Sequence, residues 1–209
     1  MSARPVKSGT VVVISGPSGV GKGTICRELL KRLDNAYLSV SVTSRPKTEK
    51  EVDGRDYWFV SYEEFQNRVG KGLLLEYAEV FGNFYGTPKD KLDEALAANK
   101  IAILEIDVQG GKQVKQIYPE AVMIFILAPN QKELAGRLFG RARDDEKTAN
   151  KRLSRAQTEI EAAQRFYEHR VINDNLQDAV SEIIGIIETE RTRKRTVTNK
   201  CNEAMEQSE

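Results

Sequence analysis

The fold is decided near the N-terminus, where residues 11–24 read VVVISGPSGVGKGT. The first part, Val11 to Ile14, is an unbroken β-branched run, which is typical of a strand that a parallel sheet buries on both faces. Glycines and then Lys22 follow it directly, and residues 25–33 carry apolar side chains at helical spacing. The order strand, glycine-rich loop, lysine and helix predicts a phosphate-binding loop.

Such a loop holds phosphate mainly through its backbone. Glycines allow successive N–H groups to turn inward, and the helix that follows directs the positive end of its dipole at the same point. We therefore expect nucleotide phosphates here, with Lys22 reaching the β- and γ-phosphates. The residues assigned to this site are Gly16, Pro17, Ser18, Gly19, Val20, Gly21, Lys22, Gly23 and Thr24.

Composition limits the remaining possibilities. The 209 residues are 40% hydrophobic and 30% charged, without an apolar run long enough to span a bilayer. The formal net charge is +1, so the molecule as a whole offers no attraction for nucleic acid or anionic membranes. Any anion site must therefore be local. The two cysteines, Cys26 and Cys201, are far apart and the N-terminus lacks a secretory signal, so we expect a cytoplasmic protein.

Beyond the loop, short apolar strands alternate with amphipathic helices, which predicts an α/β fold with a largely parallel sheet flanked by helices. Ser61 followed by Glu64 is a capping-box pattern, and Thr87 before Pro88 indicates an N-cap with a first-turn proline. Residues 1–8 and roughly the last fifteen lack periodicity, and we expect them to be frayed. Further strands are expected at 38–42, 101–106, 122–127 and 171–172, and later helices along 153–167 and 176–187.

Further segments carry a resemblance to a known family. They are residues 39–46, 51–57, 75–87, 104–110, 137–141, 150–153 and 172–174. In order and spacing they closely resemble guanylate kinase, and the resemblance extends from Thr10 to about Glu190. It implies a single domain over 1–209. Its parts would be a P-loop core at about 10–43 and 88–190, an inserted GMP-binding region at about 44–87, a mobile lid at about 137–155 and a polar tail at about 191–209.

The resemblance implies transfer of the γ-phosphoryl group of ATP to GMP, giving ADP and GDP, with Mg²⁺. Guanine presents an N1–H and an exocyclic amine as donors, so its reader needs a carboxylate and a hydroxyl. By resemblance, Glu76 and Ser41 fill these roles, and Thr87 and Asp107 lie close to the guanine amine. Adenine lacks this donor face, and a buried carboxylate left unpaired would reject it.

The GMP phosphate requires cationic or hydroxyl donors. By resemblance these are Arg45, Tyr57 and Tyr85. The family pattern also has a second phosphate-binding arginine, which would align with Thr48 in this chain. Either Lys47 or Lys50 is a candidate replacement, and the sequence does not decide between them.

Residues 137–155 contain an excess of basic side chains. Because the overall charge is close to zero, we expect the local anion site in this segment. A closing segment that delivers arginines stabilises the charge that develops in phosphoryl transfer. By resemblance the lid arginines are Arg137, Arg141 and Arg152, and they share the catalytic role with Lys22. Asn173 matches a position that contacts the adenine of ATP.

The residues expected to bind magnesium depart from the usual phosphate-loop pattern at one position. The hydroxyl residue that usually follows the loop lysine is replaced by Gly23, and a hydroxyl comes one residue later as Thr24. Asp107 ends an apolar strand. Family members commonly carry an aspartate both here and at the position of Glu105, and we rank Asp107 above Glu105 because glutamate keeps the charge but lengthens the arm. Thr24 and Asp107 are therefore the candidate metal residues, directly or through water. The alternative is that phosphates and water hold the ion.

Two other functions compete. The run from Gly21 to Thr24 looks like adenylate kinase and suggests another nucleoside monophosphate kinase, but residues 75–87 favour guanine. A catalytically silent, guanylate-kinase-like interaction module is the second alternative, and Lys22 with the lid arginines argues against it. We expect GMP and ATP as partners, with no nucleic acid and no membrane. The sequence leaves the oligomeric state open.

Overall fold

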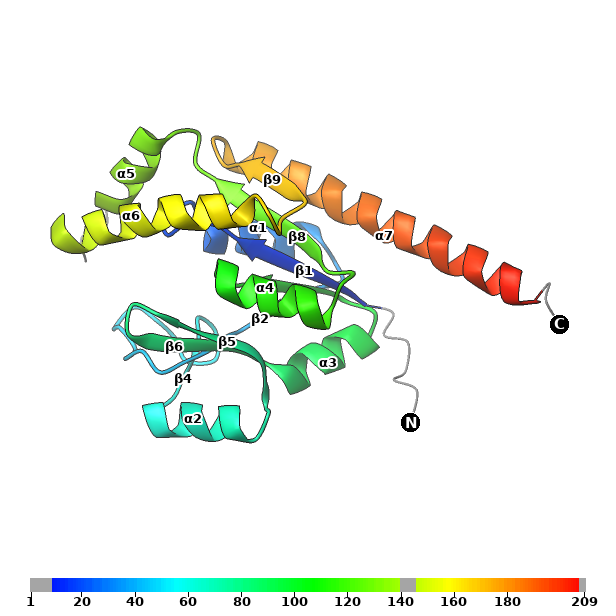
Figure 1. Ribbon diagram of the computed structural model, residues 1–209, viewed down its shortest axis with the longest axis horizontal. Coiled ribbons are helices and arrows are strands. Elements are labelled where there is room, and N and C mark those ends of the chain that lie inside the picture. The colour runs from blue at the N-terminus through cyan, green and yellow to red at the C-terminus, as the bar shows by residue number, and fades with distance from the viewer. Residues whose placement is uncertain (1–8, 140–145, 207–209) are drawn as a thin grey trace.

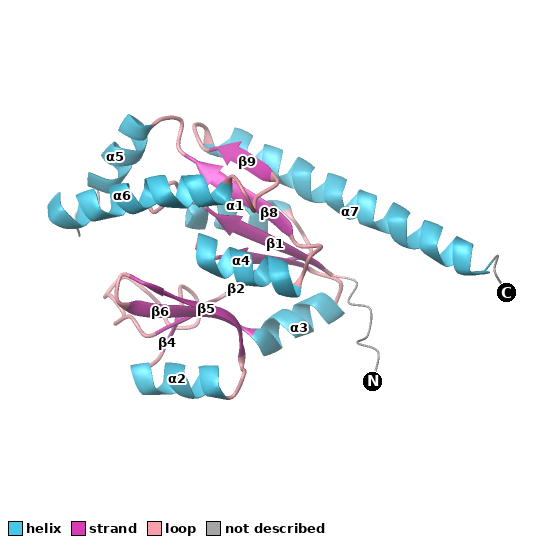
Figure 2. Cartoon of the chain, in the orientation of Figure 1, coloured by secondary structure: helices cyan, strands magenta, loops and turns pink. Residues whose placement is uncertain are grey.

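The computed structural model describes residues 9–139 and 146–206, with side chains for residues 9–137, 154, 156–194 and 196. Figures 1 and 2 show helices on both faces of a central sheet, with a smaller sheet beside it. The helices are α1 (Lys22–Arg32), α2 (Tyr62–Gly70), α3 (Lys89–Ala97), α4 (Val108–Ile117), α5 (Gln131–Phe139), α6 (Glu146–Ala163) and α7 (Leu176–Glu206). The strands are β1 (Thr10–Ser15), β2 (Ala36–Ser39), β3 (Val42–Thr43), β4 (Trp58–Phe59), β5 (Leu74–Val80), β6 (Asn83–Pro88), β7 (Ile101–Glu105), β8 (Val122–Leu127) and β9 (His169–Ile172).

The central sheet has the strand order β2-β7-β1-β8-β9, and all of its pairs are parallel. Alternate residues of β1 point to opposite faces. Val12 and Ile14 join the buried cluster formed with α1 and α7, while Val11 and Val13 join the cluster formed with α3 and α4. Because both faces are covered, every position of β1 is buried, as its continuous apolar run predicts.

The smaller sheet has the order β4-β3-β6-β5 and is built from residues 42–88. Strands β5 and β6 form an antiparallel hairpin whose two-residue turn, Phe81 and Gly82, has positive φ angles of 52° and 77°. Helix α2 contacts this sheet through Phe65, whose ring centroid lies 5.5 Å from that of Phe84 on β6. The hairpin lies beside the central sheet (Figure 2).

Two expectations about local structure need correction. The strand expected at 38–42 is divided: β2 ends at Ser39 in the central sheet, and β3 begins at Val42 in the smaller one. The chain changes sheets between them, which a period-two pattern cannot show. Thr87 does not cap α3. Its N-cap is Pro88, without a side-chain hydrogen bond, whereas the Ser61 cap is confirmed because its side chain accepts from the Glu64 N–H.

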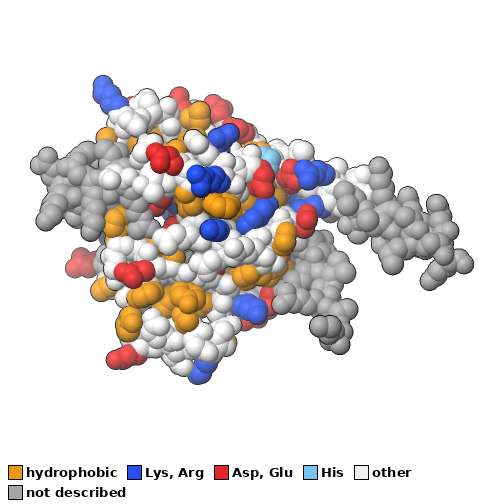
Figure 3. Space-filling model, in the orientation of Figure 1, with side chains coloured by type: hydrophobic (Ala, Val, Ile, Leu, Met, Phe, Trp, Pro, Cys, Tyr) orange, Lys and Arg blue, Asp and Glu red, His pale blue; other side chains and the backbone are white. Residues whose placement is uncertain are grey.

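The expected fraying of the C-terminal tail is also wrong as far as Glu206, because α7 continues to that residue (Figure 1). Lysine, arginine and glutamate are good helix formers and extend a helix whose earlier turns are packed. Residues 1–8 lie outside the described residues. Over the part of the chain that the structure describes, no helix is long and apolar enough to cross a membrane. Figure 3 shows charges of both signs interspersed on the face that it draws.

Candidate active site

The phosphate loop connects the central strand β1 to α1, as expected. Its glycines take left-handed backbone angles, with φ of 87° at Gly19 and 96° at Gly21. A Cβ on Gly21 would also lie 2.6 Å from Asn173 Nδ2, so a larger residue would be strained at this φ and would displace the Asn173 amide. Helix α1 begins at Lys22 with Gly21 as its N-cap. The loop therefore lies against the positive end of the helix dipole.

Lys22 reaches back over this loop. Its Nζ donates hydrogen bonds to the carbonyl oxygens of Gly16, at 2.6 Å, and Pro17, at 3.1 Å. The ammonium group is thus held beside the backbone that forms the anion cradle. This places a positive charge where loop-bound phosphate would lie.

Asn173, which follows directly after β9, supports the loop. Its Nδ2 donates to the carbonyl oxygen of Val20 at 2.7 Å, and the residue is only 8% exposed. Both terminal nitrogens of Arg137 donate to the Asn173 carbonyl oxygen, each at 3.2 Å. Asn173 therefore contacts the phosphate loop, and Arg137 contacts Asn173. The adenine contact expected of Asn173 stays a prediction.

Glu76 is the buried carboxylate of the site. It lies on β5 and is 4% exposed, and the Thr87 hydroxyl of β6 donates to its Oε1 at 2.7 Å. A Cβ on Gly110 of α4 would overlap Glu76 Oε2, so this glycine makes room for the carboxylate. Burial raises the pKa of Glu76 to about 7, and the charge of Asp107 acts in the same direction. Such a group prefers a partner that donates hydrogen bonds.

Asp107 lies just beyond the end of β7, the strand beside β1, and caps α4. Its Oδ1 accepts a hydrogen bond from the Gly110 N–H at 2.9 Å. Because the carboxyl ends of neighbouring parallel strands meet at one edge of the sheet, Asp107 and the phosphate loop share that edge. The cap also fixes Gly110 beside Glu76.

The residues expected at the acceptor phosphate gather on the smaller sheet and its loop. The rings of Tyr57 and Tyr85 meet edge to face at 5.7 Å between centroids. Arg45 Cζ lies 5.4 Å from the Tyr57 centroid. Burial raises the pKa of Tyr57 to about 12, so this phenol remains a hydrogen-bond donor at neutral pH. Arg45 also forms an ion pair with Glu51, a partner that the sequence analysis did not assign.

One cavity of about 570 Å³ connects these groups. The predicted residues that line it are Gly16, Ser18, Gly19, Gly21, Lys22, Gly23, Thr24, Ser41, Tyr57, Glu76, Tyr85 and Asp107. Arg45 and Thr87 contact lining residues without being in the lining themselves. Arg141 and the side chain of Arg152 lie outside the described residues.

The sequence analysis missed several lining residues, among them Arg27, Glu51 and Glu159, and it ranked the lining residue Glu105 below Asp107. Each is a charged residue in a charged neighbourhood, so no sequence signal separates it from a solvated surface group. The pair Gly110 and Gly111, three and four residues after Asp107, did carry a signal. Two glycines at the start of a helix are unfavourable for the helix and indicate close packing against another group.

The phosphate loop follows the carboxyl end of the central strand of a parallel sheet, and it shares a cavity with a buried carboxylate of the second sheet. This arrangement defines a P-loop nucleotide-binding protein with a separate acceptor site. The family model for guanylate kinase matches residues 8–190. The chain therefore belongs to the guanylate kinase family.

Individual relatives agree with this assignment. The chain is 45% identical to a guanylate kinase of Clostridioides difficile over 90% of this chain and 91% of that relative. It is 46% identical to a guanylate kinase of Clostridium acetobutylicum, over 90% and 88% of the two chains. A crystal structure of guanylate kinase from Anaplasma phagocytophilum matches with a TM-score of 0.74 at 33% identity, covering 88% of this chain and 87% of that one.

Proposed function

We propose that this chain transfers the γ-phosphoryl group of ATP to GMP, giving ADP and GDP. The observation that carries this proposal is the single cavity whose lining includes both Lys22 of the phosphate loop and Glu76 of the smaller sheet. A donor phosphate on the loop and an acceptor on the smaller sheet would thus face each other without intervening protein. Membership of the guanylate kinase family supports the same reaction.

Glu76 would select guanine. Its carboxylate is suited to accept hydrogen bonds from the N1–H and the exocyclic amine together. The Thr87 hydroxyl also donates to Oε1. Ser41 lines the same cavity and supplies a hydroxyl, while Asp107 lies close enough to raise the pKa of Glu76 through its charge. Adenine presents no N1–H, so the buried carboxylate would be left unpaired against AMP.

The phosphates would be held by two sets of groups. On the acceptor side the donors are Arg45, Tyr57 and Tyr85, and on the ATP side they are the loop N–H groups and Lys22. Arginines stabilise the charge that spreads over the transferring phosphoryl group, a role we assign to Arg137, Arg141 and Arg152. Closure of the segment at 137–155 over the site would also exclude water.

The donor set also fits a magnesium ion, whose preferred ligands are hard oxygen atoms. Thr24, Glu105 and Asp107, which carry a hydroxyl and two carboxylates, line the same cavity as Lys22. Among the described residues, no group of three or more acidic, histidine or cysteine side chains is placed to hold a metal ion by itself. When bound, Mg²⁺ would neutralise phosphate charge.

The test is nucleotide-dependent ADP release. The chain is supplied with ATP and Mg²⁺ and with GMP, dGMP, AMP, CMP or UMP in parallel. We expect turnover with GMP to exceed that with AMP by at least about a hundredfold, because rejection rests on an unpaired buried carboxylate. Equal use of AMP and GMP would overturn the acceptor assignment. Tight GMP binding without any turnover would instead favour the silent interaction module.

A further inference from the structure

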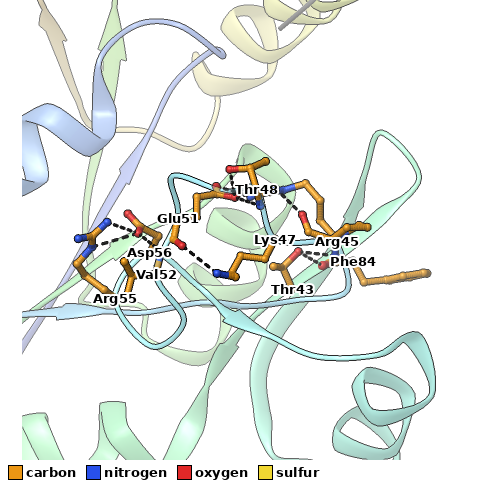
Figure 4. A network of polar contacts seen from close by, with 10 residues as sticks. Thr43, Arg45, Lys47, Thr48, Glu51, Val52, Arg55, Asp56 and Phe84 are labelled. Carbon is orange, nitrogen blue, oxygen red and sulfur yellow. Dashed lines mark hydrogen bonds and ion pairs between the residues drawn. The ribbon is translucent and has the colours of Figure 1, made fainter.

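Thr48 takes part in a closed set of contacts with Glu51, which Figure 4 shows. The Glu51 N–H donates to the Thr48 carbonyl oxygen at 3.1 Å, which closes a turn. In return, Glu51 Oε2 accepts from the Thr48 N–H at 2.9 Å and from the Thr48 hydroxyl at 2.8 Å. Two hydrogen bonds to the Glu51 carboxylate, together with the backbone bond that closes the turn, therefore fix this side chain relative to the loop.

The fixed carboxylate holds Arg45. Glu51 Oε1 accepts from Arg45 Nη2 at 2.6 Å and Oε2 from Nη1 at 3.1 Å, which is the bidentate geometry that suits a guanidinium group. The Arg45 and Glu51 side chains are 24% and 17% exposed. The Arg45 hydrogen bond is the main reason that the pKa of Glu51 falls to about 2, so the carboxylate stays charged throughout the neutral range.

The pair is placed beside the acceptor side of the cavity. Glu51 and Tyr57 both line the cavity, and Arg45 Cζ lies over the Tyr57 and Phe59 rings, at 5.4 and 5.6 Å from their centroids. The Arg45 backbone N–H donates to the Thr43 hydroxyl, which in turn donates to the Phe84 carbonyl oxygen of β6. Arg45 is thus held at its backbone by Thr43 of β3 and at its guanidinium by Glu51 (Figure 4), and Nη1 also donates to the Pro46 carbonyl oxygen at 2.8 Å.

We propose that Thr48 is a positioning residue for the acceptor phosphate: it fixes Glu51, which orients the Arg45 guanidinium. The inference rests on the proposed function. Thr48 has a defined partner of its own in Glu51, and the expectation that Lys47 or Lys50 replaces the arginine missing at this position stays a prediction. Lys47 Nζ donates to the Glu51 backbone carbonyl oxygen at 3.3 Å, so its described contact also supports this loop.

The prediction concerns a phosphate-specific effect. Thr48→Val keeps the branched shape and the backbone N–H bond but removes the hydroxyl bond to a charged acceptor. The site is partly exposed, so we expect GMP affinity to fall about three- to tenfold. Guanosine lacks the phosphate, and its affinity should change less than twofold. The kcat and the KM for ATP should also stay within about twofold, because Arg45 acts on the acceptor.

We compare the wild type with Thr48→Val by calorimetric titration of GMP and of guanosine. Steady-state kinetics give the kcat and the KM for ATP of both proteins. Thr48→Ser should restore wild-type GMP affinity, and Thr192→Val on α7 serves as a control that removes a helix-surface hydroxyl. Thr48→Ala repeats the measurement should the valine variant fail to fold. An equal loss for GMP and guanosine, no loss at all, or tighter GMP binding by Thr48→Arg would overturn the positioning role. A wild type that does not phosphorylate GMP would refute the proposed function instead.

Discussion

The substitution Glu76→Gln tests two separate effects of Glu76, namely its cost to the stability of the fold and its proposed role in guanine recognition. The substitution keeps the shape of the side chain and the acceptor for the Thr87 hydroxyl, but it removes a titrating group that is 4% exposed. Burial raises the pKa of Glu76 from 4.5 to about 7, so ionising it in the folded state costs about 3 kcal/mol relative to the unfolded chain. Glutamine carries no such penalty.

The sign follows from the direction of the shift. A carboxyl group with a raised folded pKa contributes stability that is fully present below its unfolded pKa and is lost as the pH rises through about 7. Relative to the wild type, Glu76→Gln should therefore gain stability between pH 5 and pH 8, by up to about 3 kcal/mol. Urea unfolding at both pH values measures this difference. Glu79→Gln, an exposed position on the same strand, is the control.

The same variant should lose guanine recognition. One acceptor oxygen becomes an amide donor facing the donor edge of guanine, so we expect a loss of about 3 kcal/mol, or about a hundredfold in kcat/KM for GMP. The KM for ATP should stay within about twofold. In the wild type, kcat/KM for GMP should fall as the pH drops below 7, and this limb should vanish in the variant. A stability difference that is equal at pH 5 and pH 8 would refute the reasoning.

The remaining outcomes test other parts of the site. Gly110→Ala places a methyl group against Glu76 Oε2 and should raise the KM for GMP more than about tenfold, with little effect on ATP; an unchanged KM would show that the carboxylate can move aside. Asn173→Ala removes the hydrogen bond to Val20 and should raise the KM for ATP about three- to tenfold, as steady-state titration of ATP would show. Lys22→Ala should lower kcat about a hundredfold or more while GMP affinity, measured by calorimetry, stays within twofold. Near-normal turnover at saturating substrate would remove Lys22 from the catalytic groups.

Local patterns were sufficient where the decisive contacts are themselves local. The phosphate loop and the Ser61 cap were predicted correctly because their residues are neighbours in the sequence, and glycine conformation and side-chain length limit what they can form. The burial of β1 on both faces follows from its uninterrupted β-branched run. The family resemblance added the acceptor residues, several of which line the cavity.

Sequence patterns failed where a residue had two compatible partners. Thr87 precedes a proline and resembles a helix cap, but its hydroxyl bonds to Glu76, eleven residues away on the paired strand. The helix pattern is satisfied by Pro88 without it. Only the β5 and β6 hairpin brings the two side chains together, since its register depends on the turn between the strands.

What the sequence alone determined about this protein is the α/β class, the phosphate loop and the family to which it belongs, because short-range geometry and motif order carry those conclusions. Tertiary structure decided how the acceptor side is built. Thr48 aligns with a missing cation in the sequence, yet in the structure it holds Glu51, and through it Arg45, in the site. A hydrogen-bonded carboxylate between two loop residues leaves no periodic signal. Its position follows from backbone turns and burial, which exist only once the chain has folded.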